Sequence, residues 1–176
     1  MFKATLRDTL LRAAEAKLYE VYWSETILDE VSRNLVSTGR TSAEQAERLL
    51  AAMRQFFSEA TVTGFEYLIP SMTNDEKDRH VLAAAVKAEA DAIVTSNIKD
   101  FPDRALAPFR IKRLSPDQFL VYLFNENPEA MTRIVAQQAT QLRRPPIAVK
   151  EILDVLAADA PQFVALVRPR LNPSEQ

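Results

Sequence analysis

The densest group of side chains that could do chemistry is a run of acidic residues in the stretch DEKDRHVLAAAV, residues 75–86. Helical periodicity places Asp78 near the middle of an apolar stripe formed by Val81, Leu82, Ala85 and Val86. A carboxylate on a buried face is costly unless it is paired, hydrogen-bonded or bound to a metal. Helix capping by Asn74, Asp75 or Asp78 is the alternative, because such side chains accept hydrogen bonds from first-turn N–H groups. This stretch alone favours capping.

The composition leaves carboxylates as the groups able to carry catalysis. The 176 residues include no cysteine and one histidine, His80, which excludes disulfides, thiolate sites and zinc sites built from several histidines. The two glycines, Gly39 and Gly64, cannot form a P-loop or a GxGxxG turn. With 22 basic and 24 acidic residues, the chain has no overall attraction for nucleic acid. No signal peptide or membrane span is recognisable, so we expect a cytoplasmic protein.

The hydrophobic pattern alternates between helices and short extended segments up to about residue 125. It predicts helices at 5–18, 24–35, 42–58, 77–89 and 115–124, and extended segments at 18–23, 60–65, 91–96 and 110–114. This alternation predicts an α/β fold with a mostly parallel sheet and helices on both faces. Further along, the pattern is helical only, at 128–142, 148–157 and 161–167. We therefore predict an α/β domain at 1–125 and a helical appendage at 126–176.

The predicted sheet brings acids from separate segments to one edge. Ligands of such sheets bind beyond the carboxyl ends of the strands. The stretch TSNIKDFP follows a predicted strand, which places Asn97 and Asp100 at that edge. Asp78 begins the helix that leads into the same strand, and Glu30 lies early in a helix that follows another strand. Clustered acids repel one another unless a cation neutralises them, and oxygen ligands of this kind suit Mg²⁺ or Mn²⁺.

Three motifs together resemble those of the PIN-domain nucleases, and the nearest branch is that of the VapC-type toxins. They are SETILDEV at 24–31, DEKDRHVLAAA at 75–85 and ADAIVTSNIKDFP at 90–102. The resemblance covers roughly residues 5–125. It implies a small three-layer α/β/α fold, a ring of three or four acids, and cleavage of RNA with a divalent metal.

The resemblance also assigns roles to individual residues by position. Glu30 matches the second family acid and Asp78 matches the third. Asn97 stands where many members have the fourth acid, and Asp100 follows in the common K-D-F sequence. The weaker candidates for substrate contacts are Thr95, Ser96, Asn34 and His80.

Each of these residues also has an ordinary structural interpretation. Glu30 could pair with Arg33 at helix spacing. Asn97 and Asp100 favour turn conformations, whatever their chemistry. His80 lies on the helix face opposite the apolar stripe, which indicates a surface position or a contact with RNA.

One family feature has no counterpart in the sequence. PIN-domain proteins open with a hydrophobic strand that ends in an aspartate, whereas here MFKAT runs directly into the helical stretch LRDTLLRAAEAKLY. Asp8 is not a substitute, because it lies within that helix and off its apolar stripe. A truncated or wrongly spliced start, a degenerate relative, and a gap filled by another segment or subunit all explain this difference. We therefore expect the first strand to be missing or degenerate and the activity to be low.

The sequence thus predicts an endoribonuclease that depends on Mg²⁺ or Mn²⁺. Its predicted catalytic residues are Glu30, Asp78 and Asp100, and Asn97 joins them as a metal ligand. The resemblance implies the toxin half of a toxin–antitoxin pair, with RNA as substrate, a small antitoxin protein as partner, and a homodimer. The alternative is a catalytically inactive PIN-fold protein that binds RNA or another protein.

Overall fold

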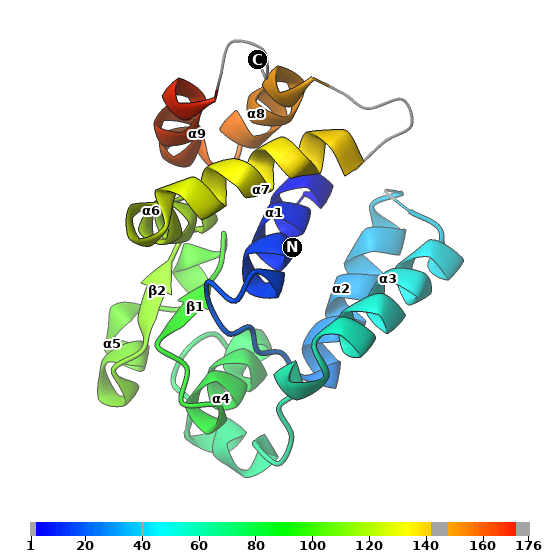
Figure 1. Ribbon diagram of the computed structural model, residues 1–176. Coiled ribbons are helices and arrows are strands. Elements are labelled where there is room, and N and C mark those ends of the chain that lie inside the picture. Colours follow the sequence, from blue (N-terminus) through cyan, green and yellow to red (C-terminus); the bar gives the residue numbers. More distant parts are fainter. Residues whose placement is uncertain (1–2, 40, 142–147, 172–176) are drawn as a thin grey trace. The chain divides into compact units, whose positions relative to one another are not determined.

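The computed structural model describes residues 3–39, 41–141 and 148–171, which form two compact units (Figure 1). The central unit comprises Glu20–Arg113. The terminal unit joins the described residues up to Tyr19 with those from Leu114 onward. The first predicted helix thus packs with the C-terminal helices. The division into domains at 1–125 and 126–176 is drawn from the sequence pattern, and it stays a prediction.

The central unit is built mainly from helices around one pair of strands. Its helices are α2 (Glu25–Ser37), α3 (Ala43–Phe56), α4 (Arg79–Lys87) and α5 (Asp103–Leu106), and its 3₁₀ helices are η1 (Ser58–Ala60), η2 (Glu66–Ser71), η3 (Glu76–Asp78), η4 (Ile98–Asp100) and η5 (Ala107–Phe109). Strand β1 (Ala92–Val94) pairs in parallel with β2 (Lys112–Leu114), and the two lie side by side in Figure 1. The predicted α/β class is confirmed.

The predicted extended segments at 18–23 and 60–65 form less sheet than expected. Their only described pairing is an isolated parallel bridge between Trp23 and Thr61. In it, the Trp23 N–H donates to the carbonyl of Ala60, and the Val62 N–H donates to the carbonyl of Trp23. Ser24 then begins α2 directly, so the pairing has no room to extend beyond one residue.

Side-chain caps fix where several of the predicted helices begin. The Ser24 hydroxyl accepts a hydrogen bond from the Ile27 N–H, and Ser42 forms a reciprocal capping box with Gln45. Ser115 forms a second capping box, with proline at the first position of the helix that follows. These caps satisfy N–H groups that a helix leaves free at its N-terminus.

The core of the central unit holds α4 against β1 and its flanking loops. Leu82, Ala83 and Ala84 of α4 are buried with Ile93 of β1, and Val81, Ala85 and Val86 pack against the same core. The predicted apolar stripe of residues 81–86 therefore faces the interior. This packing fixes the first turn of α4, where Asp78 lies, close to the apolar core.

The terminal unit is a helical bundle drawn from both ends of the sequence. It comprises α1 (Ala4–Glu15), α6 (Pro116–Glu126), α7 (Pro128–Gln141), α8 (Val149–Ala157), α9 (Pro161–Val167) and the 3₁₀ helix η6 (Arg168–Arg170). Helix α1 packs against α7 at an angle (Figure 1), and there the buried Thr9 hydroxyl donates to the Gln138 side-chain oxygen at 2.8 Å. Gln138 in turn donates to the carbonyl of Thr5 at 2.9 Å. None of the described helices has the length and apolar character needed to cross a lipid bilayer.

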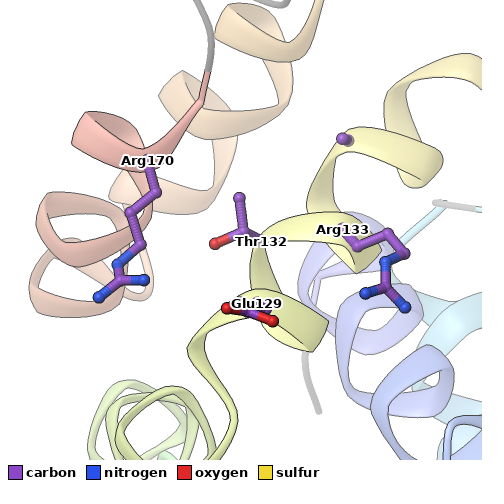
Figure 2. A pocket seen from close by; sticks show the side chains of 5 residues that line it. Glu129, Thr132, Arg133 and Arg170 are labelled. Atoms are coloured by element: carbon purple, nitrogen blue, oxygen red, sulfur yellow. The ribbon is translucent and has the colours of Figure 1, made fainter.

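A shallow groove on the terminal unit runs between α7 and η6. Figure 2 shows Glu129 and Thr132 at its centre, with Arg133 on one side and Arg170 on the other. The Thr132 hydroxyl donates to the carbonyl of Pro128, and the Arg170 guanidinium lies 5.3 Å from the centre of the Phe124 ring. The polar groups of Thr132 and Arg170 are thus engaged in contacts within the unit.

Replacing Asp117 by alanine should destabilise the terminal unit by about 2 kcal/mol. The buried Asp117 carboxylate accepts hydrogen bonds from the backbone N–H groups of Gln162 and Phe163, at 3.2 and 2.9 Å, and these groups begin α9. Urea unfolding measures the loss. The control is Asp154→Ala, which removes an exposed ion pair with Arg168 and should change stability by less than about 0.5 kcal/mol. Equal effects of the two substitutions would contradict this role of Asp117.

Candidate metal centre

Three carboxylates from two segments of the central unit come together. Asp75 precedes η3, Asp78 ends η3 where α4 begins, and Asp100 ends η4 after β1. One carboxylate oxygen from each residue lies within 4.8 Å of the other two. We call these three residues the acid cluster; it is the one such group of metal-ligating side chains found among the described residues.

Backbone hydrogen bonds hold the two segments of the acid cluster together. The Asp75 N–H donates to the carbonyl of Asp100 at 3.1 Å, which joins the loop before α4 to the loop after β1. The Asp75 carboxylate accepts a bond from the Lys77 N–H at 3.2 Å, so the capping interpretation holds for Asp75. It does not hold for Asp78, whose side chain accepts no capping bond from α4.

Asp78 carries an electrostatic penalty in the folded chain. It is half-buried, and its Oδ2 atom is buried without a hydrogen-bond partner. Burial, the side-chain hydrogen bond with Asp100 and the negative charges of Asp100 and Glu30 together raise the pKa of Asp78 to about 6. The nearby positive charge of Lys77 acts in the opposite direction. A cation placed beside Asp78 would therefore relieve a cost that the protein alone does not remove.

The pKa of Asp100 is lowered instead, because its carboxylate already receives a positive charge and a hydrogen bond. The Lys77 ammonium lies 2.8 Å from Asp100 Oδ2, and the Asn97 side-chain amide donates to the same oxygen. The Lys77 ammonium is the largest of the contacts that lower the pKa of Asp100. The same ion pair raises the pKa of Lys77. Part of the charge of the acid cluster is thus balanced from within the chain.

Glu30 lies next to the acid cluster without joining it. Its carboxylate, on α2, is 3.5 Å from His80 Nε2, and its charge is felt by Asp78. The alternative pairing with Arg33 is not observed, since the Arg33 guanidinium donates to the carbonyl of Asp29. The surface position expected for His80 is wrong, since its side chain is only 12% exposed, with Nε2 3.5 Å from Glu30 Oε2.

The weaker candidates lie around this region with fewer contacts. The Thr95 hydroxyl accepts a hydrogen bond from the Asn97 N–H at 2.9 Å, which shapes the turn after β1. Ser96 and Asn34 are exposed, and no described contact joins either side chain to the acid cluster. Asp8 pairs with Arg12 at 2.7 Å on α1, as expected of an ordinary helix residue.

Two residues that position or form the site were missed in the sequence. Asp75 was assigned to capping alone, although the D-x-x-D spacing places two carboxylates at the two ends of one turn. Arg113 of β2 donates to the carbonyl of Phe101 at 2.6 Å and pairs with Asp103 at 3.1 Å. These contacts hold the loop that carries Asp100. No local pattern indicated them, since they depend on the pairing of β1 with β2.

The acid cluster fits a hard divalent cation. Its donors are all carboxylate oxygens, which Mg²⁺ and Mn²⁺ prefer over nitrogen or sulfur. The buried and unpartnered Oδ2 of Asp78 provides an oxygen that the protein leaves without a hydrogen bond. The residues present therefore suit an ion of this class.

Asp78 should make the metal-free protein less stable as the pH rises from about 4 to about 6. The pKa of this carboxyl is higher in the folded chain than its ordinary value of 3.8, so the folded state binds more protons in that range. Stability therefore falls as this proton is lost, and the effect levels off above the folded pKa. Urea unfolding in EDTA at a series of pH values, for the wild type and Asp78→Asn, isolates the contribution. A difference between the two proteins that is constant with pH would contradict it.

Comparison with known proteins gives a family match for the N-terminal part of the sequence and another for the C-terminal part. Residues 2–99 match the family model of the PIN domain, and residues 116–169 match that of the VapC50 C-terminal domain. The chain is 45% identical over 111 residues to the protein named "Putative ribonuclease VapC50" of Mycobacterium tuberculosis (strain ATCC 25618 / H37Rv). This similarity covers 63% of the chain and 65% of the relative, so the chain spans just under two thirds of the relative's length.

No solved structure matches the chain significantly. The PIN-domain match nevertheless covers more than half of the sequence, and it includes Asp75 and Asp78 but ends at residue 99, just before Asp100. The resemblance seen in the three sequence motifs is thereby confirmed. The chain belongs to the PIN-domain family, and its similarity lies with the VapC-type branch.

Proposed function

We propose that this chain is a ribonuclease that hydrolyses phosphodiester bonds with the help of a divalent metal ion. The observation that carries the proposal is the acid cluster, in which three carboxylates lie within 4.8 Å and a buried oxygen of Asp78 has no partner. Membership of the PIN-domain family supports it, and the similar protein of Mycobacterium tuberculosis carries ribonuclease in its name.

The residues of the site would divide the work as follows. Asp75, Asp78 and Asp100 would hold a Mg²⁺ or Mn²⁺ ion, with Asn97 beside them. When bound, such an ion supplies positive charge and lowers the pKa of water for attack on phosphorus. Glu30, held near the cluster by its contact with His80, would orient the attacking water. Thr95, Ser96, Asn34 and His80 are proposed to contact the RNA.

We also propose a biological setting from the VapC-type resemblance. The chain would be the toxin half of a toxin–antitoxin pair, with a small antitoxin protein as its inhibitor. It would act on RNA in the cytoplasm as a homodimer. The matches to the VapC50 C-terminal domain and to the protein named for VapC50 support this setting.

The catalytic rate of this chain is expected to be low. Among the described residues, Asp8 does not supply the first family aspartate, because it lies within α1 and is paired with Arg12. Asp75 adds a third carboxylate that partly offsets this difference. Fewer carboxylates give less attraction for a divalent ion.

Cleavage of a mixed RNA substrate should require Mn²⁺ or Mg²⁺ and should be abolished by EDTA. Asp78→Asn should lower the rate by more than about 100-fold. Loss of a residue that only supports a metal ligand typically costs about 10- to 100-fold, and loss of a ligand itself should cost more. Asp8→Asn is the matched control, since it removes one carboxylate away from the acid cluster, and it should leave the rate unchanged. Product formation on denaturing gels is the measurement.

Equal rates for the wild type and Asp78→Asn would overturn the assignment of the acid cluster. Absence of cleavage with either metal would instead favour the alternative, a catalytically inactive PIN-fold protein that binds RNA or another protein.

A further inference from the structure

The Lys77 ammonium pairs with the carboxylate of Asp100, which is one of the proposed metal ligands. It belongs to η3, between Asp75 and Asp78, and its Nζ atom lies 2.8 Å from Asp100 Oδ2. The Lys77 side chain is 67% exposed, whereas the Asp100 side chain is 12% exposed. An exposed cation thus lies against a carboxylate that is largely covered.

We propose that Lys77 is a built-in counter-cation, which competes with the divalent ion for Asp100 and so sets the metal affinity of the acid cluster. This inference rests on the proposed function, in which the cluster is the metal site. It assigns Lys77 a role beyond that of an ordinary surface ion pair.

The competition follows from the occupancy of one oxygen atom. Asp100 Oδ2 receives both the Lys77 ammonium and the Asn97 amide, so two donors already occupy its lone pairs. A Mg²⁺ ion binds carboxylate oxygen at about 2.0–2.1 Å and requires a lone pair of its own. An ammonium on the same oxygen would repel that ion at close range. Binding at Asp100 Oδ2 therefore requires Lys77 to leave.

The structure allows Lys77 to leave without disturbing the backbone. Its own N–H is held by the Asp75 carboxylate at 3.2 Å, so the turn stays fixed when the side chain moves. The ammonium sits on a flexible four-carbon stem and is readily hydrated. In the metal-free state the Lys77 ammonium reduces the repulsion between Asp78 and Asp100. A bound divalent ion would reduce this repulsion in its place.

Lys99 provides a natural comparison for this role. It is adjacent to Asp100 in sequence and exposed, yet it forms no ion pair with the acid cluster among the described contacts. Replacing Lys99 by glutamine also removes one positive charge close to the acid cluster, but it leaves the pair between Lys77 and Asp100 Oδ2 intact. It therefore separates direct competition from a general change in charge.

Calorimetric titration of the RNA-free protein with Mn²⁺ tests the proposal. Lys77→Gln should bind Mn²⁺ about two- to fivefold more tightly than the wild type, the range expected for removal of one exposed ion pair. Lys77→Arg keeps the charge and should bind as the wild type does. Lys99→Gln should show a clearly smaller gain than Lys77→Gln.

A second measurement follows from the same exchange of cations. In EDTA, Lys77→Gln should unfold at a lower temperature than the wild type, because the acid cluster loses its counter-charge. In saturating Mn²⁺ the two proteins should unfold at similar temperatures. A role in local structure alone would lower the unfolding temperature equally under both conditions.

The outcomes separate this inference from the proposed function. If the wild type binds Mn²⁺ and loses this binding in Asp78→Asn, while Lys77→Gln binds no more tightly, the role of Lys77 is overturned and the metal site stands. An equal gain in Lys99→Gln also overturns the role of Lys77. If neither the wild type nor Lys77→Gln binds Mn²⁺, both the metal site and the competition are overturned.

Discussion

Repulsion among carboxylates next to an apolar core is the constraint on which the candidate site depends. Helix α4 buries Leu82, Ala83 and Ala84, and this packing fixes Asp78 at the edge of the core. There its charge is partly desolvated and is repelled by Asp100 and Glu30. A protein selected for stability alone gains nothing from such an arrangement. The binding of a divalent cation, as proposed, would offset this cost.

Several weak contacts hold this unfavourable arrangement in place. The bond from the Asp75 N–H to the carbonyl of Asp100 joins two loops, and Arg113 fixes the second loop through Phe101 and Asp103. None of these groups needs to touch a substrate. They keep the carboxylates close enough to share one ion, which carboxylates in free loops would not do.

The sequence predicted the parts of this structure that local chemistry determines. The helices predicted from residues 24, 42 and 115 begin at the capping residues Ser24, Ser42 and Ser115, and such a cap involves only residues within one turn. The meeting of Asp78 and Asp100 at one sheet edge followed from the order of strand and helix, and the structure brings their carboxylates together. The carry-over of roles to Glu30 and Asn97 relied on family resemblance, and it stays a prediction.

The parts that sequence could not give depend on neighbours distant in the chain. The stretch around Trp23 has strand composition, but its pairing with Thr61 stops after one residue. His80 is largely covered and lies 3.5 Å from Glu30, which belongs to another helix. Hydrophobic periodicity shows which face of a helix a residue occupies. It does not show which other helix covers that face.

The hydrogen bond between Thr9 and Gln138 joins residues separated by 129 positions. The central unit, by contrast, is one continuous stretch, Glu20–Arg113. During synthesis on the ribosome, this stretch can therefore be complete while α1 still lacks its partner α7. Closure of a loop this long is slow, because its entropic cost must be met before the contact forms. The carboxylates of the central unit would thus be assembled before α1 packs against α7.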